Sequence, residues 1–150
     1  MINKKWIIVA GAAVFLCVAC LLISYLSPGL SSRASNFGVT EKGKSALVIR
    51  NKSSAFYILD VAIEGDASQK WEHLIGKGSE RVFSIDPGAY TVRIHYSDKT
   101  DLSNLGFMTW YVSAYKSSEF EVKKGRAVVY KLEGGRTLGM MYDPPDLVVE

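Results

Sequence analysis

The sequence predicts an all-β domain, an antiparallel sandwich of about seven strands, preceded by one N-terminal transmembrane helix. The first observation is a run from Trp6 to Leu26 that carries no charged residue. The second is that, from residue 46 onward, short runs of β-branched and aromatic residues alternate with turn residues about every ten positions. The third is that no stretch after residue 30 shows an apolar helical period over about ten residues or more.

The composition excludes two classes of protein. Of the 150 residues, 48% are hydrophobic and 22% are charged, with 18 Lys and Arg against 15 Asp and Glu. That balance differs from a disordered charged tail and from a protein that binds nucleic acid through bulk positive charge, so no nucleic-acid partner is expected. Both cysteines, Cys17 and Cys20, lie in the uncharged run. The rest of the chain therefore forms no internal disulfide and no thiolate metal site.

The uncharged run has the length of a membrane span. As a helix, residues 6–26 would extend about 31 Å, close to the thickness of a hydrocarbon core. Lysines precede the run and only Arg33 follows closely, so the positive-inside rule places residues 1–5 in the cytoplasm and the C-terminal domain outside. We therefore expect a single-pass protein of the bacterial cytoplasmic membrane, in contact with lipid, with a periplasmic domain. The expected membrane-interface anchors are Lys4, Lys5, Trp6 and Tyr25.

Two other interpretations of the run stay open. A cleaved signal peptide has a shorter apolar region, of about 7 to 15 residues, although Ser32-Arg33-Ala34 resembles a cleavage site. A lipoprotein signal would place the lipidated cysteine at Cys20, after the small residue Ala19. The apolar run continues for six residues beyond Cys20, which favours a retained anchor.

Small residues form a stripe along the expected helix. They recur with spacings of 3, 4, 3 and 4, which places them on one face, at Ala10, Ala13, Cys17, Cys20 and Ser24. Small residues let helix backbones approach closely in lipid, so this face predicts docking of other integral membrane proteins. Gly, Ala, Cys and Ser are common throughout the run, so a chance arrangement is the alternative.

The remainder of the chain divides into a linker, a folded domain and a tail. Residues 27–45 are rich in Ser, Gly and single charges without periodicity, which predicts a flexible stalk. Residues 46–139 contain the strand-like runs, and residues 140–150 form an extended tail with two prolines. The expected strands are 46–49, 55–64, 71–75, 81–85, 89–96, 107–115, 120–122 and 127–132.

A tight turn with a sequence mechanism lies at Asp86-Pro87-Gly88. Proline presets φ at the second position of such a turn, and glycine tolerates positive φ at the third. Apolar residues alternate on both sides, from Phe83 to Ile85 and from Tyr90 to Ile94. This stretch resembles a hairpin of transthyretin-like, carboxypeptidase-regulatory-like and PEGA-type bacterial sandwich modules, and residues 120–130 resemble their last hairpin. The resemblance implies an immunoglobulin- or transthyretin-like sandwich, an extracytoplasmic binding or spacer module without catalytic residues.

No catalytic motif is found in the sequence. The only histidines are His73 and His95, and neither has the spacing of a metal site. His95 is expected on the polar face of its strand near Asp98 and Asp101, as a surface histidine. A serine nucleophile on a strand–helix elbow would show the motif G-x-S-x-G, which the sequence lacks. We therefore expect no enzymatic activity, no metal and no cofactor.

Aromatic and apolar residues instead favour recognition. Residues 107–111 lie in a segment that is only partly strand-like, so they predict either an exposed apolar rim or a part of the sandwich interior. In the tail, Leu147-Val148-Val149 suits a strand added to a sheet edge, its own or another protein's, unless the terminus is loose. The candidate partner contacts are Phe107, Met108, Trp110, Tyr111, Tyr142, Pro144 and Pro145.

The sequence therefore predicts a non-catalytic accessory subunit of a larger bacterial membrane complex, of the respiratory, photosynthetic, transport or secretion type. One helix would dock on neighbouring helices, and the sandwich would contact the extracytoplasmic domains of partner subunits. The alternative is a binding module, anchored or secreted, that captures a carbohydrate, peptide or envelope component. In that case Trp71, Trp110 and Tyr111 would be stacking platforms.

Overall fold

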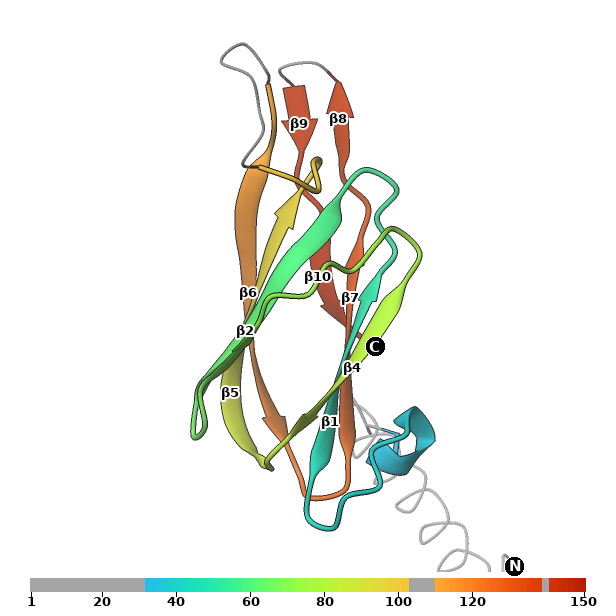
Figure 1. The fold of residues 1–150 in the computed structure, drawn as a ribbon, viewed down its shortest axis with the longest axis vertical. Helices are drawn as coiled ribbons and strands as arrows, with labels where there is room; N and C mark the ends of the chain where they lie inside the picture. The colour runs from blue at the N-terminus through green and yellow to red at the C-terminus, as the bar shows by residue number, and fades with distance from the viewer. Residues whose placement is uncertain (1–31, 103–109, 139–140) are drawn as a thin grey trace, which may run out of the picture. The chain divides into compact units, whose positions relative to one another are not determined.

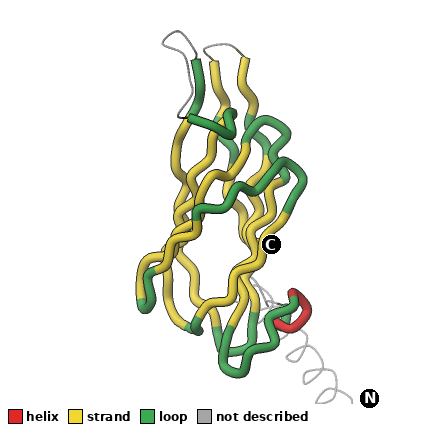
Figure 2. Tube along the Cα trace, in the orientation of Figure 1, coloured by secondary structure: helices red, strands yellow, loops and turns green. Residues whose placement is uncertain are grey.

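The computed structural model describes residues 32–102, 110–138 and 141–150. In these ranges the chain forms two four-stranded sheets, a two-stranded hairpin and one short 3-10 helix, η1 (Ala34–Phe37). Strands and their connecting turns make up almost all of the described chain (Figure 1, Figure 2). The prediction of an all-β sandwich is confirmed.

Several sequence predictions concern residues outside the described ranges. They are the interface anchors Lys4, Lys5, Trp6 and Tyr25, the stripe Ala10, Ala13, Cys17, Cys20 and Ser24, and the contacts Phe107 and Met108. No helix within the described ranges qualifies as a membrane span.

The first sheet contains β10 (Asp146–Val149), β7 (Ala127–Glu133), β1 (Ser45–Asn51) and β4 (Glu80–Ile85), in that order. Strand β1 pairs antiparallel with β4 and parallel with β7. The prediction of a purely antiparallel sandwich is therefore wrong for one pair of strands, β1 and β7. A parallel pair needs a long crossover, and the chain from β2 to β6 provides it.

The second sheet contains β3 (Gln69–Trp71), β2 (Tyr57–Gly65), β5 (Gly88–Ser97) and β6 (Ser113–Val122), and all its pairs are antiparallel. In the described part of the chain, the strands expected at 107–115 and 120–122 are one strand of ten residues, β6. Its polar centre, Lys116-Ser117-Ser118, interrupts the pattern of apolar residues from which a strand is predicted. A polar strand is tolerated here because β6 is an edge strand whose residues are alternately exposed and half-buried.

Two connections that were expected to be hairpins cross between the sheets. Strand β4 is in the first sheet and β5 in the second, so Asp86-Pro87-Gly88 joins strands that do not pair, and Lys123-Lys124-Gly125 does the same between β6 and β7. A turn sequence sets the local bend but not the pairing of the flanking strands. Gly88 does not adopt a positive φ, and a Cβ there would lie 2.7 Å from the Asp66 carboxylate, which accepts the Ala89 N–H. Glycine at position 88 thus leaves room for the Asp66 carboxylate and is not required by its φ.

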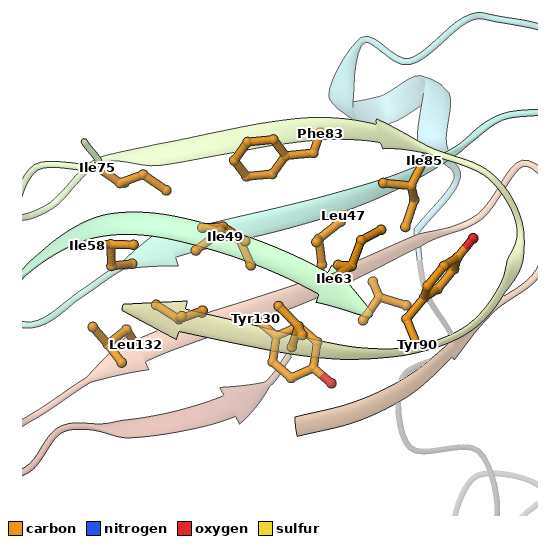
Figure 3. Packing of buried hydrophobic residues seen from close by; sticks show 14 of the residues in the cluster. Leu47, Ile49, Ile58, Ile63, Ile75, Phe83, Ile85, Tyr90, Tyr130 and Leu132 are labelled. Atoms are coloured by element: carbon orange, nitrogen blue, oxygen red, sulfur yellow. The ribbon is translucent and has the colours of Figure 1, made fainter. Parts of the chain in front are cut away.

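One apolar core fills the space between the two sheets (Figure 3). Side chains from both sheets point toward one another in it, among them Leu47, Ile49, Ile58, Ile63, Phe83, Ile85 and Leu132. Each of these side chains is at most 5% exposed, and full burial of one of them stabilises the fold by about 1.5–3 kcal/mol. Trp71 closes one side of the core by packing on Phe83, with the ring centroids 4.5 Å apart.

A second, smaller apolar cluster covers the outer face of the first sheet. It contains Ala46 and Val48 of β1 beside Ala127 and Val129 of β7. Residues 32–44, the later part of the segment expected to be a stalk, lie against this face, and the Ala34 N–H donates to the Gly125 carbonyl oxygen at 3.0 Å. Strand β1 is consequently buried on both of its faces.

The C-terminal tail adds a strand to its own sheet. Leu147 of β10 lies opposite Leu132, and the Glu150 N–H donates to the Val129 carbonyl oxygen at 2.9 Å. The Glu150 carboxylate also accepts a hydrogen bond from the Arg50 guanidinium. The sandwich therefore extends to the last residues of the chain.

Tyr130 of β7 links the two sheets through hydrogen bonds to β6. Its hydroxyl lies 3.1 Å from both the Glu119 carbonyl oxygen and Ser118 Oγ, while its ring is buried. Burial raises the pKa of Tyr130, because the neutral phenol is favoured over the phenolate in an apolar environment.

Stability is expected to fall as the pH rises above about 10, where a hydrated tyrosine loses its proton. Below that pH both states keep the Tyr130 proton; above it the unfolded state loses its proton first, because the pKa is raised only in the folded state. The free energy of unfolding therefore falls as the pH rises through this window. Urea unfolding of the full chain in mild detergent, at about pH 8 and about pH 11, should show a smaller loss of stability in Tyr130→Phe than in wild type.

Tyr111→Phe is the matched control, because Tyr111 is 48% exposed and its ring meets water in both states. It should keep the wild-type loss of stability. An equal loss in wild type and in Tyr130→Phe would contradict a role for this buried hydroxyl.

Candidate functional site

Exposed apolar side chains gather at one end of the sandwich. Strands β8 (Arg136–Leu138) and β9 (Met141–Asp143) form a hairpin that extends beyond the two sheets, at the same end as the start of β6 (Figure 1). Trp110 and Leu138 are each 72% exposed and Met141 is 70% exposed. We call this surface the apolar tip, and define it as Trp110, Tyr111, Leu138, Met141 and Tyr142.

Two consecutive glycines carry the chain from β7 into the hairpin. Gly134 and Gly135 have φ values of +69° and +74°, in the left-handed region that glycine adopts without strain. The Gly134 carbonyl oxygen accepts the Ser53 hydroxyl at 2.7 Å. A Cβ on Gly135 would lie 2.6 Å from Phe56 Cε2 and 2.9 Å from the Pro145 nitrogen. The direction of the hairpin is therefore set by a position where only glycine fits.

Tyr142 attaches the base of the hairpin to the core. Its ring meets Phe56 edge-on, with the centroids 6.1 Å apart, and its hydroxyl lies 3.1 Å from the hydroxyl of buried Tyr96. Burial, together with this hydrogen bond, raises the pKa of Tyr96. Leu138 and Met141 are paired across the hairpin and are 72% and 70% exposed, so they project their apolar surface into solvent.

The segment before β6 is held by the end of β5. The Val112 N–H donates to Asp98 Oδ1 at 2.9 Å, and the Asp98 N–H donates to the Val112 carbonyl oxygen at 3.3 Å. Val112 packs against the core, whereas Trp110 and Tyr111 stay exposed. The β8–β9 hairpin and the segment before β6 are thus both tied to the sandwich, while the aromatic and thioether groups of the tip remain accessible.

The apolar tip has the chemistry of a recognition surface. Aromatic residues and Met are enriched where proteins contact one another, and exposed apolar groups in one place are costly for an isolated soluble domain. The charges that flank the tip partly compensate each other, since Arg136 Nε lies 3.9 Å from Asp143 Oδ2.

A separate polar cluster lies on the outer face of the second sheet. His95 Nδ1 is 3.0 Å from Asp60 Oδ2, and His95 Nε2 is 2.7 Å from Ser113 Oγ. The sequence predicts a surface histidine near Asp98 and Asp101, whereas the His95 side chain is only 13% exposed and contacts Asp60 and Ser113, and Asp98 binds Val112. Among the residues that the structure describes, no three His, Cys, Asp or Glu side chains gather as metal ligands would.

The candidate contacts named from the sequence have different environments. Trp110, Tyr111, Tyr142 and Pro144 are exposed, whereas Pro145 is buried. Trp71, named as a stacking platform, is half-buried and packs on Phe83. A carbohydrate platform that uses Trp71 is therefore unsupported.

The residues that were not predicted as site residues from the sequence are Leu138 and Met141 of the tip, and Asp60 and Ser113 of the polar cluster. For Leu138 a signal existed: Gly134-Gly135 is followed by apolar residues on both sides of a short connection, as in a hairpin. Asp60 and Ser113 meet His95 only through strand pairing, for which the sequence gives no local signal.

No protein-family model, no curated protein and no solved structure matches this chain.

Gly135→Ala is expected to destabilise the domain by about 1–3 kcal/mol more than Gly78→Ala. Both changes force an L-residue into a left-handed conformation, at a cost of about 1–2 kcal/mol. Only the Cβ at position 135 also collides with Phe56 and with the backbone at Pro145, since nothing lies within 4 Å of a Cβ at position 78. Urea unfolding of the full chain in mild detergent measures both losses, and equal losses would show that the hairpin entry is not sterically fixed.

Proposed function

We propose that this chain is an accessory subunit of a bacterial membrane complex, and that its apolar tip contacts the extracytoplasmic domain of a partner subunit. The observation that carries the proposal is the 70–72% exposure of Trp110, Leu138 and Met141 on a hairpin and a segment that are both fixed to the sandwich. A pre-positioned apolar surface loses little conformational entropy when a partner covers it.

The proposed location follows from the N-terminal sequence. The uncharged run of residues 6–26, with lysines before it, supports a retained helix in the cytoplasmic membrane and a periplasmic sandwich. The small-residue stripe from Ala10 to Ser24 supports docking of that helix on other integral membrane proteins. A complex would then hold the chain at two places, through its helix and through its tip.

A transthyretin-like module is the finer fold class in this proposal. The two sheets of four strands, with β1 inside the first sheet beside β7, support it. Such a module serves as a rigid scaffold that carries a recognition surface.

A binding module for a carbohydrate or peptide is the second candidate. The exposure of Trp110 and Tyr111 favours it, because an accessible aromatic ring can stack on a sugar or on a peptide side chain. Unlike the subunit proposal, this one requires binding by the chain alone, without other membrane proteins.

Replacing Leu138 and Met141 with Ser is expected to reduce co-purification with partner proteins by about tenfold or more, because central apolar contacts dominate interface energies. The measurement is the amount of each partner recovered per chain after gentle detergent extraction of native membranes. Val148→Ser, at a position that is 38% exposed on β10, is the control and should retain the partners.

Partners recovered equally with the tip variant and the control would contradict the proposed role of the tip. A monodisperse monomer that binds a soluble glycan or peptide through Trp110 would favour the second candidate instead. An intact chain that alkaline carbonate removes from membranes would contradict the anchor.

A further inference from the structure

Three polar side chains from three strands meet on the outer face of the second sheet. Asp60 of β2 lies directly opposite His95 of β5, and Ser113 of β6 lies opposite Ser97, two residues beyond His95. Because alternate residues of a strand face the same side, this register places all three side chains on one face. The contacts therefore follow from the sheet itself and not from a loop.

The two ring nitrogens of His95 have different partners. Nδ1 lies 3.0 Å from Asp60 Oδ2, and Nε2 lies 2.7 Å from Ser113 Oγ. A carboxylate only accepts, so it fixes the ring proton on Nδ1 and leaves the lone pair of Nε2 directed at the serine hydroxyl. This is the arrangement in which an imidazole acts as general base for a serine.

The histidine is shielded while the serine is accessible. The side chains of His95 and Asp60 are only 13% and 16% exposed, whereas Ser113 is an exposed residue. The Tyr115 ring stacks on the imidazole, with centroids 4.4 Å apart and planes 19° apart, and Arg93 lies over the same tyrosine ring. The base is thus held in orientation, and a substrate has access to the hydroxyl.

The edge position of β6 supplies a donor beside the hydroxyl. The Val112 carbonyl oxygen accepts from β5, at the Asp98 N–H, so the next residue, Ser113, directs its own N–H away from β5. An amide in this position can stabilise the negative oxygen that forms when the serine attacks a carbonyl. Trp110 and Tyr111, three and two residues earlier, offer exposed apolar surface for an acyl group.

We propose that Ser113 is an activated nucleophile for acyl transfer, with His95 as its general base, Asp60 as the residue that orients the base, and esters of apolar acyl groups as substrates. Ser113 Oγ bonds to the ester carbonyl carbon while its proton passes to His95 Nε2. The carbon–oxygen bond to the alcohol then breaks, and the alcohol leaves with that proton. Water deacylates the serine by the same path in reverse. This activity goes beyond the proposed docking role and does not depend on it.

The probe that tests this proposal is an alkyl fluorophosphonate, which bonds through phosphorus to an activated serine and releases fluoride. The full chain in mild detergent is treated with it, and the modified residue is located by tandem mass spectrometry. We expect labelling at Ser113, none in Ser113→Ala, and a rate about 100-fold lower in His95→Asn, because a general base contributes about 100-fold or more. Asp60→Asn should also slow labelling, by about tenfold or more, because the ring loses its orienting carboxylate.

Ser117→Ala is the matched control, since Ser117 is exposed on the same face of β6, opposite Arg93. It should label at the wild-type rate. A thermal melt of each variant shows whether its sandwich is folded. A folded wild type that labels no faster than the urea-unfolded chain would overturn the proposal, and so would labelling that is unaffected by His95→Asn. In both cases the cluster would only tie three strands together.

Discussion

The burial of β1 on both faces is the constraint on which the rest of the structure depends. Leu47 and Ile49 enter the core between the sheets, while Ala46 and Val48 lie under residues 32–44 on the outer side. With β4 on one edge and β7 on the other, this strand fixes the register of the first sheet. The exit of β7 into Gly134-Gly135, and so the position of the tip hairpin, follows from that register.

Both functional regions that we propose meet at the start of β6. The mutual hydrogen bonds of Asp98 and Val112 hold this point to the end of β5, with Trp110 and Tyr111 before it and Ser113 directly after it. The apolar tip is one consequence of this arrangement and the Asp60–His95–Ser113 cluster is another. A partner covering the tip would therefore also border the face on which Ser113 lies.

Sequence patterns predicted the strands well wherever one face is apolar and the other polar, as in β2 and β5. They failed for β6, whose residues Lys116 to Ser118 are polar because an edge strand has less surface to bury. They also misjudged Asp86-Pro87-Gly88, since a turn sequence does not show which sheet the next strand joins.

Trp110 and Tyr142 were found as candidate contacts because their residue types favour interfaces. The contacts of His95 could not be found, because strand register alone brings Asp60 and Ser113 to it. The expectation from the sequence that the chain has no catalytic activity is untested, and the acyl-transfer proposal for Ser113 stands against it.

Hydrogen exchange tests most directly whether the rigid sandwich presents its apolar tip to a partner. The measurement compares, by mass spectrometry, the full chain purified alone with the same chain in the assembly extracted gently from native membranes. Amides of β1 should exchange slowly in both samples, whereas those of residues 110–111, 136–138 and 141–143 should exchange more slowly in the assembly than in the chain alone. Equal exchange of the tip residues in the two samples would contradict the account.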